Sequence, residues 1–118
     1  MGFLMTWQIL TTKTFDDWLF TQPIVIQEKI LAHLCLLAEY GASLGRPYAD
    51  TINGSDFANM KELRIQIQGE PYRAFYAFDP KRQAIILCCG NKAHDKRFYQ
   101  TMIALADDLY QKHLDTLE

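Results

Sequence analysis

The strongest constraint on the fold is a succession of three short segments in which apolar and polar residues alternate, separated only by tight turns. In the first segment Leu63, Ile65 and Ile67 share one face and Glu62 and Arg64 share the other, a period of two that is typical of a β-strand. Strands joined by such short turns pair antiparallel, because a parallel pair needs a long crossover. The sequence therefore predicts a meander with strands at 60–68, 72–79 and 83–89 and turns at 69–71 and 79–82.

Helical patterns flank this meander. The segment 24–40 lies between Pro23 and Gly41 and carries a wide apolar stripe, which predicts a helix packed on a core. The expected elements are a strand over 6–12, a helix over 14–20 with Thr14 as N-cap, the helix 24–40, a connecting loop over 41–56, the three strands of the meander and a final helix that contains Phe98. This order, βααβββα, predicts an α+β fold, and the length predicts a single domain over residues 1–118.

The charges are distributed unevenly along the chain. The formal net charge is −2, which by itself disfavours a nucleic-acid partner. Residues 61–97, however, carry a net charge of +4, and the flanking segments 1–60 and 98–118 carry −3 each. The cations of the meander are therefore either solvated on an open sheet face or placed to hold a phosphate through charge-assisted hydrogen bonds.

The cysteines indicate reduced thiols rather than a disulfide or a metal site. Cys88 and Cys89 are neighbours in a predicted strand, so their side chains point to opposite faces. Together with His94 they form only half of a zinc-ligand pattern, and no metal or other cofactor is expected. No apolar run reaches the roughly 18 to 20 residues that a membrane helix needs, and no signal-peptide pattern is present. The sequence predicts a cytoplasmic protein without a membrane partner.

Residues 61–114 resemble the RelE/ParE toxin superfamily of bacterial type II toxin-antitoxin systems, and within it the phage-associated HigB-like branch. Four pieces carry the resemblance, in the order and at the spacing of the family: KELR at 61–64, PYRAFYAFDPKR at 71–82, GNK at 90–92 followed by RFY at 97–99, and ALADDLYQKHL at 104–114. The resemblance implies a RelE-like fold, with a curved antiparallel sheet packed against the N-terminal helices and a C-terminal helix.

The resemblance also implies an activity and partners. RelE and HigB proteins cleave mRNA on the ribosome without a metal, through attack of the RNA 2′-hydroxyl on the adjacent phosphate. The expected function is therefore that of a toxin and mRNA interferase, with the ribosome and mRNA as partners. A small antitoxin, with a helix-turn-helix domain as in HigA-type partners, is expected to neutralise it.

Three residues match positions of catalytic groups in the family, and a fourth is a candidate because of its own chemistry. Arg73 matches the mid-sheet arginine that binds the scissile phosphate, and Lys92 stands where an arginine often stabilises the leaving oxygen. Tyr99 matches the tyrosine that stacks on a base, although Phe98 could take that place. His94 is a candidate proton carrier, because imidazole titrates near neutral pH. The lysine at 92 lacks the bidentate fork of an arginine.

A second group of cations is expected to contact the RNA backbone, namely Lys61, Arg64, Lys96 and Arg97. Arg64 could instead pair with Glu62 or Glu70 at the surface. Two other functions stay open. One is a ParE-like protein that inhibits DNA gyrase by binding, for which the site cations would be unnecessary. The other is an RNA-binding regulatory module without catalysis.

Overall fold

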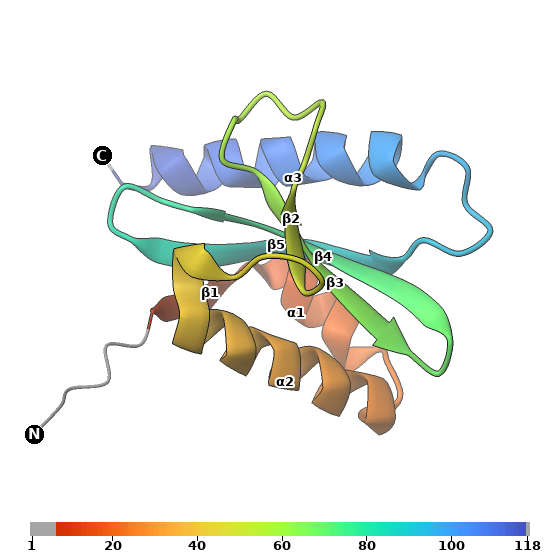
Figure 1. Cartoon of the computed structure of the whole chain (residues 1–118). Helices are drawn as coiled ribbons and strands as arrows, with labels where there is room; N and C mark the ends of the chain where they lie inside the picture. The colour runs from red at the N-terminus through yellow and green to blue at the C-terminus, as the bar shows by residue number, and fades with distance from the viewer. Residues whose placement is uncertain (1–6, 118) are drawn as a thin grey trace, which may run out of the picture.

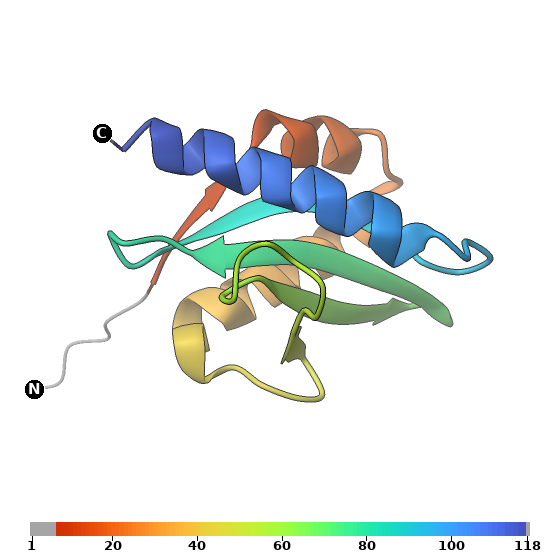
Figure 2. The ribbon, with the colours of Figure 1, turned by 90° about the horizontal axis from the view of Figure 1, so that it is seen from above.

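The computed structural model of the chain describes residues 7–117, in which one mixed five-stranded sheet lies between helices on both faces (Figure 1). Helices α1 and α2 cover one face, and α3 runs across the other (Figure 2). The elements are β1 (Gln8–Thr11), α1 (Lys13–Phe20), α2 (Ile24–Tyr40), a short 3₁₀-helix (Gly41–Ser43), β2 (Ala49–Thr51), β3 (Lys61–Ile67), β4 (Glu70–Phe78), β5 (Gln83–Asn91) and α3 (Phe98–Asp115).

The sheet has the strand order β1-β5-β4-β3-β2. The predicted meander is confirmed, since β3, β4 and β5 pair antiparallel in sequence. The expected antiparallel sheet is mixed at one edge, because β1 pairs with β5 in parallel. The segment 41–56 is also more than a loop, because β2 within it extends the sheet at the other edge by pairing with β3. Of the predicted first strand, residue 6 lies outside the described residues.

Local chemistry explains where two of these elements start or turn. Helix α1 is capped by Thr12 rather than by the expected Thr14, because the Thr12 hydroxyl accepts a hydrogen bond from the Phe15 N–H at 3.1 Å. The first hairpin turns at Gln68 and Gly69 rather than at 69–71. Both residues have a positive φ, which is the backbone that a two-residue hairpin turn requires.

The sheet separates two apolar cores. Leu63, Ile65 and Tyr76 pack with α1 and α2 on one side, whereas Phe75 and Leu87 pack with α3 on the other. The neighbouring cysteines follow the same alternation, with Cys89 in the first core and Cys88 in the second. Burial raises the pKa of the Cys88 thiol to about 12 and raises that of Cys89 as well, so both thiols are inert. No helix within residues 7–117 is long and apolar enough to cross a bilayer.

A buried carboxylate ties the β4–β5 turn to the far end of α3. Asp79 is 5% exposed, and its carboxylate accepts hydrogen bonds from the backbone N–H groups of Lys81 and Gln83 and from the Gln83 side chain. His113 of α3 contacts it at 2.8 Å. Burial raises the pKa of Asp79, but the hydrogen bonds from His113, Gln83 and Lys81 outweigh burial, so the pKa lies below its usual value.

We expect Asp79→Asn to lower the free energy of unfolding at pH 7 by about 2 kcal/mol, because hydrogen bonds to a charged acceptor are replaced by weaker ones. A carboxylate with a lowered folded-state pKa stabilises the fold above its unfolded pKa, near 4, and loses this contribution as the pH falls through the folded value. Urea denaturation at pH 7 and pH 3 should therefore show a smaller difference between wild type and variant at pH 3. Asp108→Asn, which removes an exposed carboxylate paired with Lys112, is the control and should change stability little. An equal loss in the two variants would contradict the assignment.

Candidate functional site

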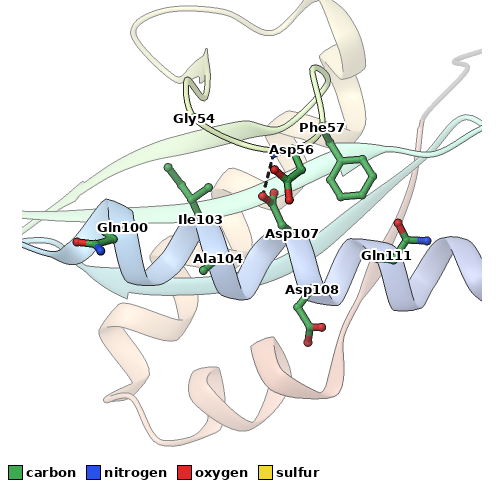
Figure 3. A pocket seen from close by; sticks show the side chains of 9 residues that line it. All are labelled: Gly54, Asp56, Phe57, Gln100, Ile103, Ala104, Asp107, Asp108 and Gln111. Atoms are coloured by element: carbon green, nitrogen blue, oxygen red, sulfur yellow. Dashed lines mark hydrogen bonds between the residues drawn. The ribbon is translucent and has the colours of Figure 1, made fainter.

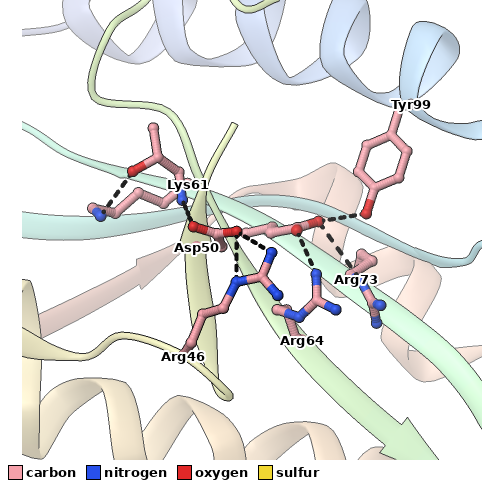
Figure 4. Close-up of polar contacts among 8 residues, drawn as sticks. Arg46, Asp50, Lys61, Arg64, Arg73 and Tyr99 are labelled. Carbon is pink, nitrogen blue, oxygen red and sulfur yellow. Dashed lines mark hydrogen bonds and ion pairs between the residues drawn. The ribbon is translucent and has the colours of Figure 1, made fainter. Parts of the chain in front are cut away.

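A buried carboxylate, Glu62, organises the cations at one corner of the sheet. Arg64, Arg73 and Tyr99 point toward one another there (Figure 4). Glu62 lies in β3 on the side that faces α3, directly opposite Phe75 of β4, and is 4% exposed. Its Oε1 accepts a hydrogen bond from the Tyr99 hydroxyl at 2.8 Å, and its Oε2 accepts one from Arg64 Nη1 at 3.1 Å. Arg73 Nε lies 3.6 Å from Oε1 and forms an ion pair with it. A buried charge persists only when it is paired in this way.

The two arginines of this network stand side by side on neighbouring strands. Arg64 and Arg73 are directly opposite each other in the β3–β4 register, so their side chains leave the same face of the sheet. The Arg73 side chain is 5% exposed and donates from Nη1 to the Tyr72 carbonyl at 2.9 Å, whereas the Arg64 side chain is 27% exposed. Arg73 is therefore held rigidly with little of its side chain exposed, whereas Arg64 is more accessible to a ligand.

Lys92 and Tyr99 complete the corner from the segments that follow β5. The Lys92 N–H bonds to the Pro71 carbonyl, and the Lys92 ammonium lies 5.5 Å from the centre of the Tyr99 ring. Burial lowers the pKa of Lys92, and the nearby charges of Arg73 and Arg64 lower it further, so this ammonium gives up its proton more readily than an ordinary lysine. Burial, followed by the hydrogen bond to Glu62, raises the pKa of Tyr99 and keeps the phenol protonated.

A fourth cation, Arg46, reaches the same corner from the segment before β2. Its Nε and Nη2 donate to Asp50 Oδ2 at 3.0 and 2.6 Å. The hydrogen bonds from Arg46, and then that from the Thr51 N–H, lower the pKa of Asp50, which stays ionised. A pocket of about 330 Å³ opens between these groups and is lined by Arg46, Pro47, Arg64, Gln66 and Arg73.

The structure brings some of the predicted residues together and separates others. Arg64, Arg73, Lys92 and Tyr99 lie at one corner. Lys61 does not, because it shares the opposite face of β3 with Leu63, and its nearest polar partner is the Thr51 hydroxyl at 3.5 Å. Phe98 is 4% exposed in the core beneath α3, so the alternative in which it stacks on a base is wrong.

His94, Lys96 and Arg97 lie on the exposed loop between β5 and α3. His94 sits there with a φ of 61°, and within residues 7–117 its side chain forms no hydrogen bond or ion pair. The three residues border the corner without taking part in its network.

Two members of the corner, Glu62 and Arg46, are absent from the sequence-based site. The alternation places Glu62 on the polar side of β3. That side is predicted to face solvent unless α3 is known to cover it. Arg46 lies in a segment that reads as a loop. The GRP sequence at 45–47 carries no pattern that links it to the meander.

A larger pocket, of about 880 Å³, lies elsewhere, between α3 and the segment before β3 (Figure 3). Its lining includes the carboxylates of Asp56, Asp107 and Asp108, and Asp107 accepts hydrogen bonds from Ser55 and from the Asp56 N–H. An acidic wall repels phosphate. The arrangement that suits an anionic substrate is therefore the cationic corner, where Arg46, Arg64, Arg73 and Lys92 outnumber Asp50 and Glu62.

Comparisons with known proteins identify the family of the chain. A family profile described as "Phage derived protein Gp49-like" matches residues 17–111. Two Mycobacterium tuberculosis proteins that carry the toxin names HigB2 and HigB3 are 44% and 43% identical to the chain over 108 and 100 residues. The chain belongs to the phage-derived Gp49-like family. The two alignments cover 90% and 84% of this Gp49-like chain, and 54% of HigB2 and 86% of HigB3, so the chain spans about half the length of HigB2.

Solved structures show that this member of the Gp49-like family has the RelE fold. A mutant of the E. coli toxin RelE in the free state matches with a TM-score of 0.59 at 9% identity, over 83% of this chain and 96% of that one. The archaeal RelE-RelB complex from Pyrococcus horikoshii gives a TM-score of 0.56 at 18% identity, over 76% and 99%. The M. tuberculosis toxin-antitoxin complex RelBE2 gives 0.53 at 17%, over 73% and 98%.

Proposed function

We propose that this protein is the toxin of a type II toxin-antitoxin system and cleaves mRNA held by the ribosome. The observation that carries the proposal is the set of cations at the corner, where Arg64, Arg73 and Lys92 converge beside Tyr99. The toxin names of its relatives support the proposal that the protein is a toxin. The RelE-RelB complex among the matched folds supports an antitoxin as its partner. We propose a small helix-turn-helix protein of the HigA type for that role.

In the proposed reaction the 2′-hydroxyl of one nucleotide gives its proton to a water molecule and attacks the adjacent phosphorus. The bond to the 5′-oxygen of the next nucleotide breaks, leaving a 2′,3′-cyclic phosphate and a 5′-hydroxyl. Arg73 and Arg64 stabilise the charge that develops on the phosphate oxygens, because preorganised donors act most strongly in a partly buried site. Lys92 stabilises the leaving 5′-oxygen and protonates it, a task that its lowered pKa suits. The Tyr99 ring faces the RNA as a stacking surface.

The ribosome has a physical role in this proposal. The corner has an excess of about two positive charges, and α3 and the N-terminal segment carry net negative charge, so long-range attraction of RNA is weak. An mRNA already held in place by the ribosome reaches the site at a high effective concentration.

Brief expression in cells tests the proposal. New 5′ ends on abundant transcripts, detected by primer extension, and unchanged plasmid supercoiling are the expected result. Lys92→Ala should reduce the ends by about 100-fold, because it removes a charge and a proton donor from the reacting centre, and Lys112→Ala on α3 should leave them unchanged. Altered supercoiling without new ends would instead assign gyrase inhibition. RNA binding without new ends would assign a non-catalytic regulatory module.

A further inference from the structure

We infer that Arg46 and Gln66 extend the cationic pocket of Arg64 and Arg73 past the reacting phosphate and hold the RNA phosphodiester next to the one that is cleaved. The inference rests on the proposed function, since it assigns the single-stranded RNA backbone to this corner. It adds a binding subsite at which no bond is broken, and it gives a role to a residue outside the meander.

The shape and chemistry of the pocket point to an anion. Of the five residues that line its roughly 330 Å³, three are arginines, one is Gln66 and one is Pro47, and none is acidic. Arg73 lies buried, whereas Arg46 and Gln66 are exposed. A phosphate in the pocket would meet guanidinium forks, whose planar donors match its oxygens in pairs.

Arg46 is held in position by the backbone rather than by its own side chain alone. The N–H groups of Tyr48 and Ala49 both bond to the Gly45 carbonyl at 3.0 Å, which closes a tight turn around residue 46. The Arg64 N–H donates to the Tyr48 carbonyl at 2.8 Å, so this turn is fastened to β3 at the residue whose side chain shares the pocket. The two guanidinium groups are therefore brought together by main-chain hydrogen bonds.

The side chain of Arg46 keeps donors available for a ligand. Within residues 7–117 its hydrogen bonds run from Nε and Nη2 to a single oxygen of Asp50, which leaves Nη1 able to donate. The Arg46 side chain is 66% exposed, so a ligand can approach without rearrangement. Asp50 orients the guanidinium but stands outside the pocket lining.

Binding of a single-stranded 2′-O-methyl oligoribonucleotide, which cannot be cleaved, tests the subsite by fluorescence anisotropy across a range of salt concentrations. Arg46→Gln should weaken binding about 5-fold, and the slope of log K against log salt should become shallower by about 0.7, the value for one lost phosphate contact on a single strand. Arg46→Lys should restore the slope and part of the affinity. Lys13→Gln is the matched control, because Lys13 also forms an exposed i,i+4 pair, with Asp17, and it lies far along the chain from the pocket. It should leave both quantities unchanged.

Cleavage of ribosome-bound mRNA separates this inference from the proposed function. A binding subsite predicts that Arg46→Gln raises KM with little change in kcat, whereas loss of a group at the reacting phosphate lowers kcat. A fall in kcat alone, wild-type binding and salt slope in Arg46→Gln, or no measurable binding of the oligonucleotide by the wild-type protein at low salt would each overturn the inference. If the wild-type protein binds RNA through Arg46 but cuts no mRNA, the subsite stands and the proposed nuclease function fails.

Discussion

Replacing Arg73 by glutamine is expected to lower the rate of mRNA cleavage at least 100-fold, roughly the effect of removing one preorganised donor from a developing oxyanion. Arg73 is the innermost cation of the corner, fixed by the Tyr72 carbonyl and by Glu62. Its fixed position means that it needs no reorganisation when charge develops on the phosphate. Single-turnover cleavage of ribosome-bound mRNA measures the effect, because single-turnover rates isolate the chemical step.

The choice of glutamine matters because Arg73 is not the open sheet-face residue that its position suggests. At 4% exposed it belongs to the interior, so Arg73→Ala would leave a void and would remove one of the two cations paired with Glu62. Each variant therefore needs a melting curve beside its rate. Arg82→Gln, at the β4–β5 turn, where its guanidinium lies 4.8 Å from the Trp7 ring centre, is a matched control and should cleave normally. A folded Arg73→Gln protein with the wild-type rate would remove Arg73 from the reaction.

Glu62→Ala is expected to cause the largest loss of stability among the changes considered, about 3 to 5 kcal/mol in the free energy of unfolding. The Glu62 and Arg73 side chains are only 6% and 5% exposed, so solvent barely screens their interaction. Removing the carboxylate leaves the Arg73 cation buried without its counter-ion and leaves the Tyr99 hydroxyl without its acceptor. Urea denaturation followed by circular dichroism measures the change.

Two further variants show whether charge is the cause. Glu62→Gln keeps the shape and the acceptor for Tyr99, so its loss should be smaller than that of Glu62→Ala. The double variant Glu62→Leu, Arg73→Met replaces the buried pair by apolar side chains and should recover most of the stability, while cleavage stays absent. A double variant that is as unstable as Glu62→Ala would show that shape, and not an unpaired charge, dominates at this position.

Most of the fold could be predicted from the sequence because its signals are periodic. The alternation in β3 placed Leu63, Ile65 and Ile67 on one face correctly, and the stripe between Pro23 and Gly41 gave α2 its observed bounds. The strand β2 was not predicted, because its three residues are too few to show a period of two. It is defined only by its pairing with β3, which the sequence does not reveal.

The site was predicted in part, and the misses have a common physical origin. Arg64, Arg73, Lys92 and Tyr99 converge as expected from the resemblance. Glu62 was missed because the polar residues of an alternating strand are expected to face solvent. Only the packing of α3 over that face shows that Glu62 is buried. Arg46 was missed because its neighbourhood depends on the turn at Gly45 and the bond from Arg64 to Tyr48.

The parallel pairing of β1 with β5 affects when the chain can fold during its synthesis. Gln8 pairs with Gln83, which lies 75 positions later in the chain. Strand β1 therefore has no partner until the ribosome has made the residues between them. Contacts between such distant segments form slowly, because the chain must first close a long loop. Tyr99, which binds Glu62, is translated later still. A nascent chain therefore carries Arg46, Arg64 and Arg73 before it has made Lys92 and Tyr99, so the corner is not complete until most of the protein has been synthesised.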